Sequence, residues 1–163
     1  MRLLGSRLAL FGLLALLVGC DHVTKHVAKT RLETAAPRPL VQGILDLHYR
    51  ENTDVAFNLL RFVPESTRKP VLVVAGGAGV LALLVLLGRW AGRGATTVAV
   101  LLVTAGALGN YADRIARGYV VDFVHHAHWP VFNDADTYVT VGVVLLALVT
   151  LRRRAQKPAS SGG

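Results

Sequence analysis

The sequence predicts an all-α membrane protein with four transmembrane helices and a small extracytoplasmic β-sheet element. Composition is the first observation behind this class: 53% of the 163 residues are hydrophobic and the mean hydropathy is +0.47. A soluble domain of this size does not need so many apolar runs. The second observation is that charged residues flank these runs, as they do around transmembrane helices. We therefore expect a single integral membrane domain.

The first apolar run, Leu8 to Cys20, is short for a span of about 20 residues. It becomes long enough if the helix continues to Val27, which requires Asp21 and Lys25 to avoid lipid. These two lie four residues apart, so they share a helix face and can pair. The remaining runs are bounded by charges or prolines. The predicted spans are residues 8–27, 71–87, 95–111 and 137–151.

The loops at residues 28–70 and 112–136 are predicted to be extracytoplasmic. Ile44 to Asn52 alternates apolar and polar residues, which is typical of a strand, and Tyr119 to Val124 is also strand-like. Pro37, Pro39, Pro64 and Pro70 are expected to act as breakers. We expect a small sheet on the bilayer surface and a disordered tail at residues 155–163.

The net charge of +8 and pI of about 10.4 are compatible with nucleic-acid binding or with a membrane surface. The cations flank apolar runs, which favours membrane lipids as partners and no nucleic acid. Eight of the 18 Lys and Arg residues crowd into the N-terminus, the turn between the second and third spans, and the C-terminal tail. This density predicts that both termini are cytoplasmic.

The segment ending in LVGC at Cys20 is also compatible with a lipoprotein signal peptide whose cysteine is lipidated. The three later apolar runs favour an ordinary first span instead. Since Cys20 is the single cysteine, an intrachain disulfide framework is excluded.

Asp122 and Asp136 are the candidate catalytic residues. Asp122 follows the third span and Asp136 begins the fourth, so both can lie at one depth near the outer membrane surface. Two nearby carboxyls cannot both ionise easily, so one can activate water while the other keeps a proton. Solvated turn residues are the alternative interpretation, with Asp136 as a helix N-cap.

Asn110, Asn133 and Arg114 support a site at the same place. The side-chain amides of Asn110 and Asn133 can hydrogen-bond a substrate backbone where water is scarce. Arg114 can clamp substrate carbonyls or a phosphate. A simple ion pair of Arg114 with Asp113 is an equally good interpretation.

Three histidines beside Asp122 raise a metal hypothesis, with Glu51 or Asp134 as a further ligand. Their spacing lacks the helical i, i+4 pair of a typical zinc site, so we expect no metal. The histidines are His125, His126 and His128.

At these residues the chain resembles the lipoprotein signal peptidase family, also called signal peptidase II. Asp21 and Lys25 match its D-x-x-x-K motif, and Asn52-Thr53 with Ala56-Phe57 match N-T-G-x-A-F. GALGNYADRI, GYVVDF and FNDAD match later motifs in family order. Together the motifs are specific and cover nearly the whole chain.

The resemblance implies an aspartyl endopeptidase of the bacterial inner membrane that uses no metal or other cofactor. It implies cleavage of prolipoproteins before a diacylglyceryl-modified cysteine, with the active site near the extracytoplasmic face. It also implies roles for residues at the matching motif positions, and we expect a monomer. Catalytic roles fall on Asp122 and Asp136, substrate-binding roles on Asn52, Asn110, Arg114 and Asn133, and supporting roles on Asp21, Lys25, Gly106 and Ala135.

Asp54 departs from the family pattern, which has glycine at that position. A carboxylate there adds negative charge near the site and changes the backbone preference. The alternative from another class is a four-span transporter or assembly factor that uses its aspartates to bind protons or ions.

Overall fold

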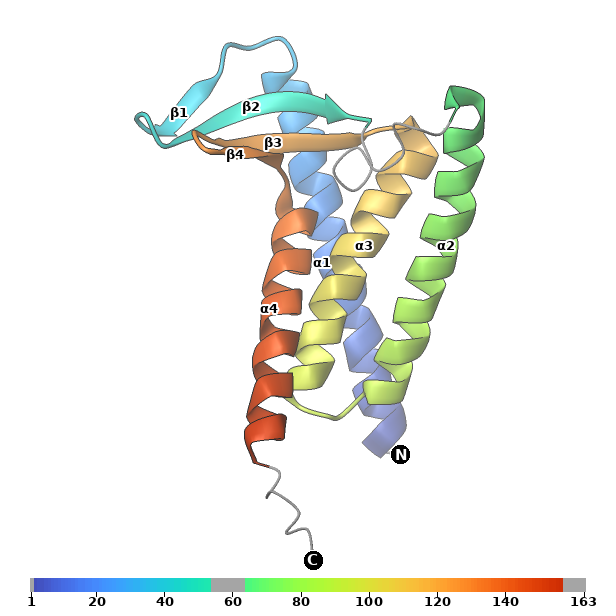
Figure 1. The fold of residues 1–163 in the computed structure, drawn as a ribbon. Helices are drawn as coiled ribbons and strands as arrows, with labels where there is room; N and C mark the ends of the chain where they lie inside the picture. The colour runs from blue at the N-terminus through green and yellow to red at the C-terminus, as the bar shows by residue number, and fades with distance from the viewer. Residues whose placement is uncertain (1, 54–63, 157–163) are drawn as a thin grey trace, which may run out of the picture.

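The structure is a computed structural model that describes residues 2–53 and 64–156. Four long helices run side by side, and a four-stranded sheet lies across one end of them (Figure 1). The elements are α1 (Arg2–Leu32), β1 (Arg38–Val41), β2 (Leu45–Asn52), α2 (Glu65–Trp90), α3 (Ala95–Arg117), β3 (Val120–His126), β4 (Trp129–Phe132) and α4 (Asp134–Ala155).

All four helices are long and apolar enough to cross a membrane, which confirms the predicted fold class. Each extends beyond the predicted span, because hydropathy marks only the part of a helix that lies in hydrocarbon. The clearest correction is at Pro70, expected to be a breaker, which lies inside α2. The helix thus begins at Glu65 rather than at residue 71. At the other end of the chain, α4 runs to Ala155, and the predicted tail beyond Gln156 lies outside the described residues.

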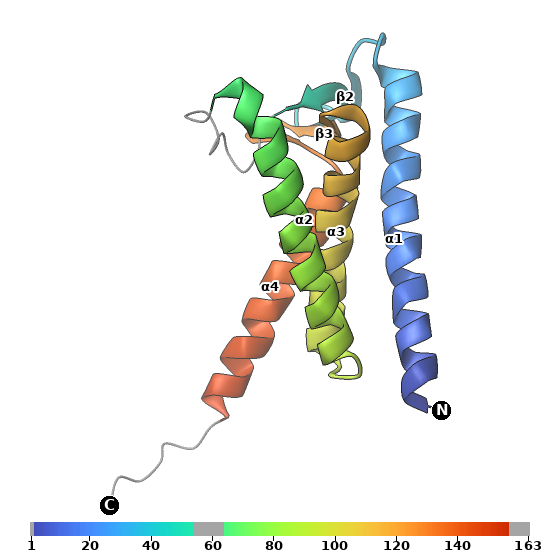
Figure 2. The same ribbon diagram turned by 90° about the vertical axis from the view of Figure 1, so that its right-hand side faces the viewer.

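Helix α3 is the central helix of the bundle (Figures 1 and 2). Half of its most apolar window is buried within the protein, against 11–17% for the other three helices. Its neighbours approach it closely at glycines: Gly76 and Gly77 of α2 face the Tyr111 ring, whereas Gly79 faces open space. Gly76 and Gly77 therefore allow α2 to approach α3 closely.

The sheet is antiparallel, with strand order β1-β2-β3-β4. Strand β2, from the first loop, pairs with β3, from the second, so loops far apart in sequence form one sheet. The strands predicted at Ile44–Asn52 and Tyr119–Val124 are confirmed as β2 and β3, with β3 extending to His126. Val121 and Phe123 of β3 pack against Ala28 and Leu32 at the end of α1. This contact holds the sheet over the helix ends.

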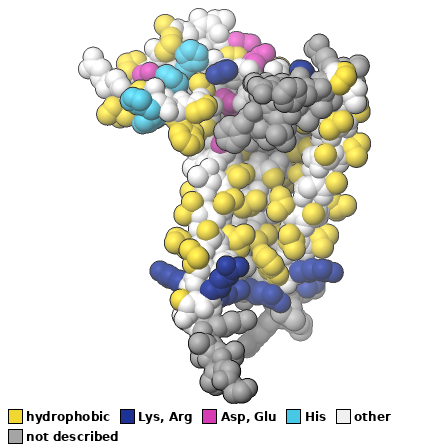
Figure 3. Space-filling view, in the orientation of Figure 1, with side chains coloured by type: hydrophobic (Ala, Val, Ile, Leu, Met, Phe, Trp, Pro, Cys, Tyr) yellow, Lys and Arg dark blue, Asp and Glu magenta, His cyan; other side chains and the backbone are white. Residues whose placement is uncertain are grey.

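Basic side chains gather at the opposite end of the bundle from the sheet (Figure 3). The N-terminus, the α2–α3 turn and the end of α4 all lie at that end (Figure 1). Exposed arginines in these segments include Arg89, Arg93 and Arg152 to Arg154. The two ends of the molecule therefore differ in both charge and architecture.

Candidate active site

Asp122 lies in the middle of β3, with only 1% of its surface exposed. Both of its carboxylate oxygens accept hydrogen bonds from side-chain amides. Asn52 Nδ2 donates to Oδ2 at 2.8 Å, and Asn133 Nδ2 donates to Oδ1 at 2.6 Å. Because Asn52 ends β2 and Asn133 precedes α4, the carboxylate joins three separate parts of the chain.

Asp136 lies in the first turn of α4, but it is not the N-cap that one interpretation of the sequence suggested. Asn133 is the N-cap, and its side-chain oxygen accepts the N–H of Asp136 at 3.0 Å. The Asp136 carboxylate in turn accepts the N–H of Asn133 at 3.2 Å, which completes a capping box. The second oxygen of Asp136 accepts Asn110 Nδ2 at 2.8 Å. Backbone and side-chain bonds thus fix its orientation.

Asn133 connects the two aspartates directly. Its amide nitrogen donates to Asp122, while its backbone N–H and side-chain oxygen engage Asp136. The same amide nitrogen lies 3.3 Å from Asn110 Oδ1. The structure therefore brings together Asp122, Asp136 and three of the four predicted substrate-binding residues, namely Asn52, Asn110 and Asn133.

Burial raises the pKa of Asp122 to about 6, and the negative charge of Asp136 acts in the same direction. The hydrogen bonds from Asn52 and Asn133 and the positive charge of Lys25 oppose this rise. Desolvation is the larger effect, so the carboxyl holds its proton far more readily than a solvated aspartate. This is the electrostatic situation in which two neighbouring carboxyls can divide acid and base roles.

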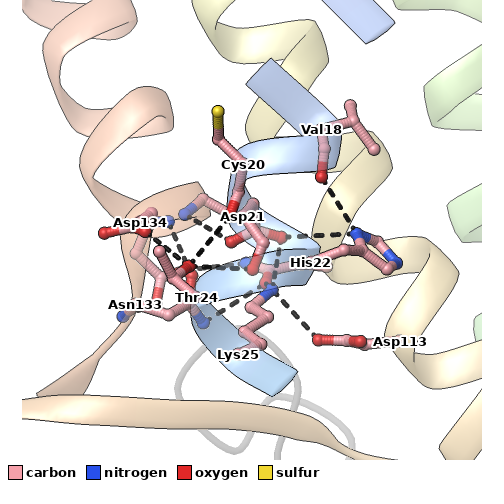
Figure 4. Close-up of polar contacts among 12 residues, drawn as sticks. Val18, Cys20, Asp21, His22, Thr24, Lys25, Asp113, Asn133 and Asp134 are labelled. Atoms are coloured by element: carbon pink, nitrogen blue, oxygen red, sulfur yellow. Dashed lines mark hydrogen bonds and ion pairs between the residues drawn. The ribbon is translucent and has the colours of Figure 1, made fainter. Parts of the chain in front are cut away.

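Lys25 is buried together with Asp21 and Asp113, toward which it points (Figure 4). Its ammonium group lies 2.8 Å from Asp21 Oδ2, as the i, i+4 spacing predicted, and 3.0 Å from Asp113 Oδ2. It also donates to Asn110 Oδ1 at 2.9 Å. One cation therefore neutralises a charged pair and orients the amide that holds Asp136.

Asp21 also reaches α4, because its Oδ1 accepts the N–H of Ala135 at 3.0 Å. Thr24, on the same face of α1, donates to Asp134 Oδ2 at 2.6 Å (Figure 4). The start of α4 is therefore tied to α1 by two bonds. Thr24 was missed in the sequence, although its spacing of three from Asp21 places it on the same helix face.

Asp113 does not form the ion pair with Arg114 that was one of the two interpretations of the sequence. It pairs with Lys25 and, at 3.0 Å, with Arg117 one helical turn away. The guanidinium of Arg114 instead donates to the carbonyl of Asn110 at 3.2 Å. Arg114 is thus attached to the residue that holds Asp136.

Gly106 and Ala135 allow α3 and α4 to approach one another at the site. A Cβ atom at Gly106 would collide with the carbonyl of Ala135 and with the Val139 side chain. Ala135 itself is completely buried. At Gly109, one turn along α3, a Cβ would come within 2.5 Å of Asp21 Oδ2. Small residues here set the distance between Asp136 and Asn110.

The histidines of the second loop do not converge with Asp122. His125 Nδ1 lies 3.6 Å from Asp46 Oδ2, its partner in the sheet, and the His125 ring lies near the His48 ring. His126 Nδ1 accepts the backbone N–H of His128 at 3.3 Å. Within residues 2–53 and 64–156, no group of three or more His, Cys, Asp or Glu side chains could hold a metal ion.

A cavity of about 390 Å³ opens beside Asp136, between the β3–β4 hairpin and α4. Apart from Asp136, its lining is mostly apolar. The lining residues are His126, Trp129, Phe132, Asp136, Thr137, Thr140 and Val141. Most of them were not singled out in the sequence, since they carry no recognisable catalytic pattern.

The fold and the site define a multi-pass membrane protein with two hydrogen-bonded aspartates, Asp122 buried and Asp136 partly buried, at one end of its helices. The family model described as signal peptidase (SPase) II matches residues 13–152. The chain therefore belongs to the signal peptidase II family, and it is a protease of a multi-pass, bacterial inner-membrane type.

Individual relatives agree with this assignment. A lipoprotein signal peptidase of Acinetobacter baumannii is 36% identical over 92% of this chain and 87% of its own length. Those of Streptococcus pyogenes and Halothermothrix orenii are 34% and 33% identical, over 83% and 78% of this chain and 88% and 85% of their own lengths. A solved bacterial membrane enzyme matches with a TM-score of 0.80 and 25% identity, over 95% of this chain and 94% of that one.

Proposed function

We propose that this protein is an aspartic endopeptidase that removes signal peptides from diacylglyceryl-modified prolipoproteins, with Asp122 and Asp136 as its catalytic pair. The observation that carries the proposal is the position of Asn133, which bonds to both carboxylates. The names of the relatives supply the substrate class. Cleavage falls on the amino side of the lipidated cysteine.

The pair divides the work of hydrolysis. One ionised carboxylate takes a proton from water, which attacks the scissile carbonyl, and the other carboxyl polarises that carbonyl and then protonates the leaving nitrogen. Asp122 is the candidate for the protonated partner, because its pKa is raised to about 6. Burial strengthens the electrostatic interactions of the carboxyls with water and with the scissile carbonyl, since a low dielectric weakens such forces less than water does.

The remaining residues of the site support this chemistry. Asn52, Asn110 and Asn133 orient the carboxylates, and the same side chains are proposed to contact the substrate backbone. Arg114 is proposed to contact substrate beside Asn110, and Asp21 and Lys25 to hold the helices in register. Asp54, which departs from the family pattern, lies outside the described residues.

We propose that the sheet end faces the extracytoplasmic side and that both termini are cytoplasmic. The concentration of arginines at the opposite end supports this orientation. The scissile bond of a signal peptide lies at the outer end of its apolar segment, which is the depth at which Asp122 and Asp136 lie. The protein would act as a monomer among membrane lipids.

The test is cleavage of a synthetic lipopeptide that carries a diacylglyceryl cysteine, by purified protein in detergent. The proposal expects one product whose new N-terminus is the lipidated cysteine, and no cleavage of the same peptide without the lipid. Cleavage at another bond, or equal cleavage of the unlipidated peptide, would refute the assigned substrate.

A further inference from the structure

The cavity beside Asp136 has no role in the chemistry described above, although the carboxyl-bearing Asp136 is one of its lining residues. Its other walls come from the β3–β4 hairpin and from the next turns of α4. Phe132 and Val141 are apolar. The hydroxyls of Thr137 and Thr140 are bonded to helix carbonyls at 3.3 and 2.8 Å, which leaves their methyl groups for a ligand. The cavity therefore suits an apolar ligand.

His126 is the polar side chain of the hairpin on this cavity. Its Nδ1 accepts the backbone N–H of His128, so the neutral ring carries its proton on Nε2. Among the described residues, no side chain or carbonyl accepts a hydrogen bond from Nε2. His126 thus offers one neutral donor to a ligand in the cavity. Trp129 offers an indole N–H at the rim, where its side chain is 64% exposed.

We propose that this cavity binds the glyceryl diester of the lipidated cysteine, with the Nε2–H of His126 donating to an ester carbonyl. The inference rests on the proposed function and extends it to a specificity-determining residue. The cysteine sulfur is only a few covalent bonds from the leaving nitrogen, so the lipid must lie next to the catalytic pair. A mostly apolar cavity that includes Asp136 meets that requirement.

Neutral donors also fit the chemistry of the group. Each ester carbonyl is a neutral acceptor, and the acyl chains beyond it require apolar walls such as Phe132 and Val141. A charged partner would suit a phosphate headgroup better than an ester. The pattern of neutral donors, His126 and Trp129, beside apolar walls therefore favours an uncharged diester over a phospholipid headgroup.

The test compares two lipopeptides that differ only in the linkage of the lipid to glycerol: a diacyl form with ester carbonyls and a dialkyl form with ether oxygens. KM and kcat are measured for the wild type and for His126→Phe, which keeps the ring volume and removes the donor. We expect KM for the diester to rise about 5- to 10-fold, the effect of losing one neutral hydrogen bond. For this variant, KM for the diether and kcat for both substrates should stay within about twofold of the wild-type values.

Two further variants distinguish the loss of the hydrogen bond from a structural disturbance of the hairpin. His126→Gln retains an N–H donor and should keep KM for the diester near the wild-type value. His128→Ala keeps the backbone N–H that bonds to His126 and removes an exposed ring, so it should behave as wild type. If His126→Phe does not accumulate in membranes, His126→Ala replaces it in the same comparison.

Equal KM increases for ester and ether substrates would overturn the inference, because the donor would then have no specific role. An unchanged KM for the diester would do the same. Either result leaves the proposed function intact, since the wild type still cleaves. Failure of the wild type to cleave either lipopeptide would instead refute the proposed function itself.

Discussion

Asn133 donates a 2.6 Å hydrogen bond to Asp122 and at the same time caps the helix that carries Asp136. One residue thus fixes the position of one aspartate through its side chain and of the other through the backbone. This relationship explains how a strand and a helix, joined by a short hairpin, keep two carboxylates in one site.

Asn133→Ala should therefore impair both stability and activity. Loss of a helix N-cap costs about 1 kcal/mol, and loss of a donor to a buried carboxylate costs about 1–3 kcal/mol more. Thermal unfolding in detergent and lipopeptide cleavage measure the two effects. Asn133→Ser keeps a capping oxygen but lacks the amide donor, so it should recover stability more than activity. Full activity of the alanine variant would contradict the bridging role.

Lys25→Met should be strongly destabilising. The substitution keeps an unbranched side chain but leaves Asp21 and Asp113 buried without their shared cation, which costs about 3–5 kcal/mol. Lys29→Met, one turn further along α1, is the matched control, because its side chain is partly exposed and its ammonium group contacts Tyr119 and Glu33 rather than the buried cluster. A similar loss of melting temperature in both variants would show that the buried cluster has no special importance.

Gly106→Ala should separate α3 from α4 at the site. The new methyl group would overlap the carbonyl of Ala135, and relief of such overpacking costs about 1–3 kcal/mol. Gly79→Ala, on a face of α2 with open space around it, should leave stability and cleavage almost unchanged. The comparison is made by thermal unfolding and kcat of the two variants; equal behaviour would argue against close packing at Gly106.

Asp122 should make stability depend on pH in a defined direction. Its pKa is raised from 3.8 to about 6 in the folded protein, so folding favours its protonated form. The stabilising contribution is fully present below pH 4 and is lost as pH rises through 6. The shift corresponds to about 3 kcal/mol at pH 7, as an order of magnitude.

Asp122→Asn removes this titration. The melting temperature of the variant, relative to wild type, should therefore increase between pH 4.5 and pH 7.5. The two proteins are compared by thermal unfolding in the same detergent at both pH values. A difference in melting temperature that stays constant with pH would contradict a raised pKa for Asp122.

The fold was predictable from the sequence because long apolar segments have few alternatives in a membrane. The outer strands were not predicted. β1 contains Pro39 and β4 contains Pro130, and proline within a run argues against a strand. Both are edge strands, where a missing N–H is tolerated because one side of the strand has no partner in the sheet.

The site was predictable to the extent that motifs and helix periodicity determine it. The Asp21–Lys25 pair follows from spacing alone. The contacts of Lys25 with Asp113 and Asn110 depend on how α1 packs against α3, which no local pattern encodes. Likewise, the sequence singled out Asp136 but did not show that Asp134 bonds to Thr24 of α1 while Asp136 bonds to Asn110 of α3.

The central claim is that Asp122 and Asp136 act together, and single-turnover cleavage of a diacylglyceryl lipopeptide tests it most directly. Asp122→Asn and Asp136→Asn should each reduce the rate by at least about 1,000-fold, as expected when members of one catalytic unit are removed. Asp134→Asn, two residues from Asp136 and bonded to Thr24 rather than to the pair, is the control and should retain most activity. Near-wild-type turnover by either of the first two variants, correctly inserted in the membrane, would contradict the account.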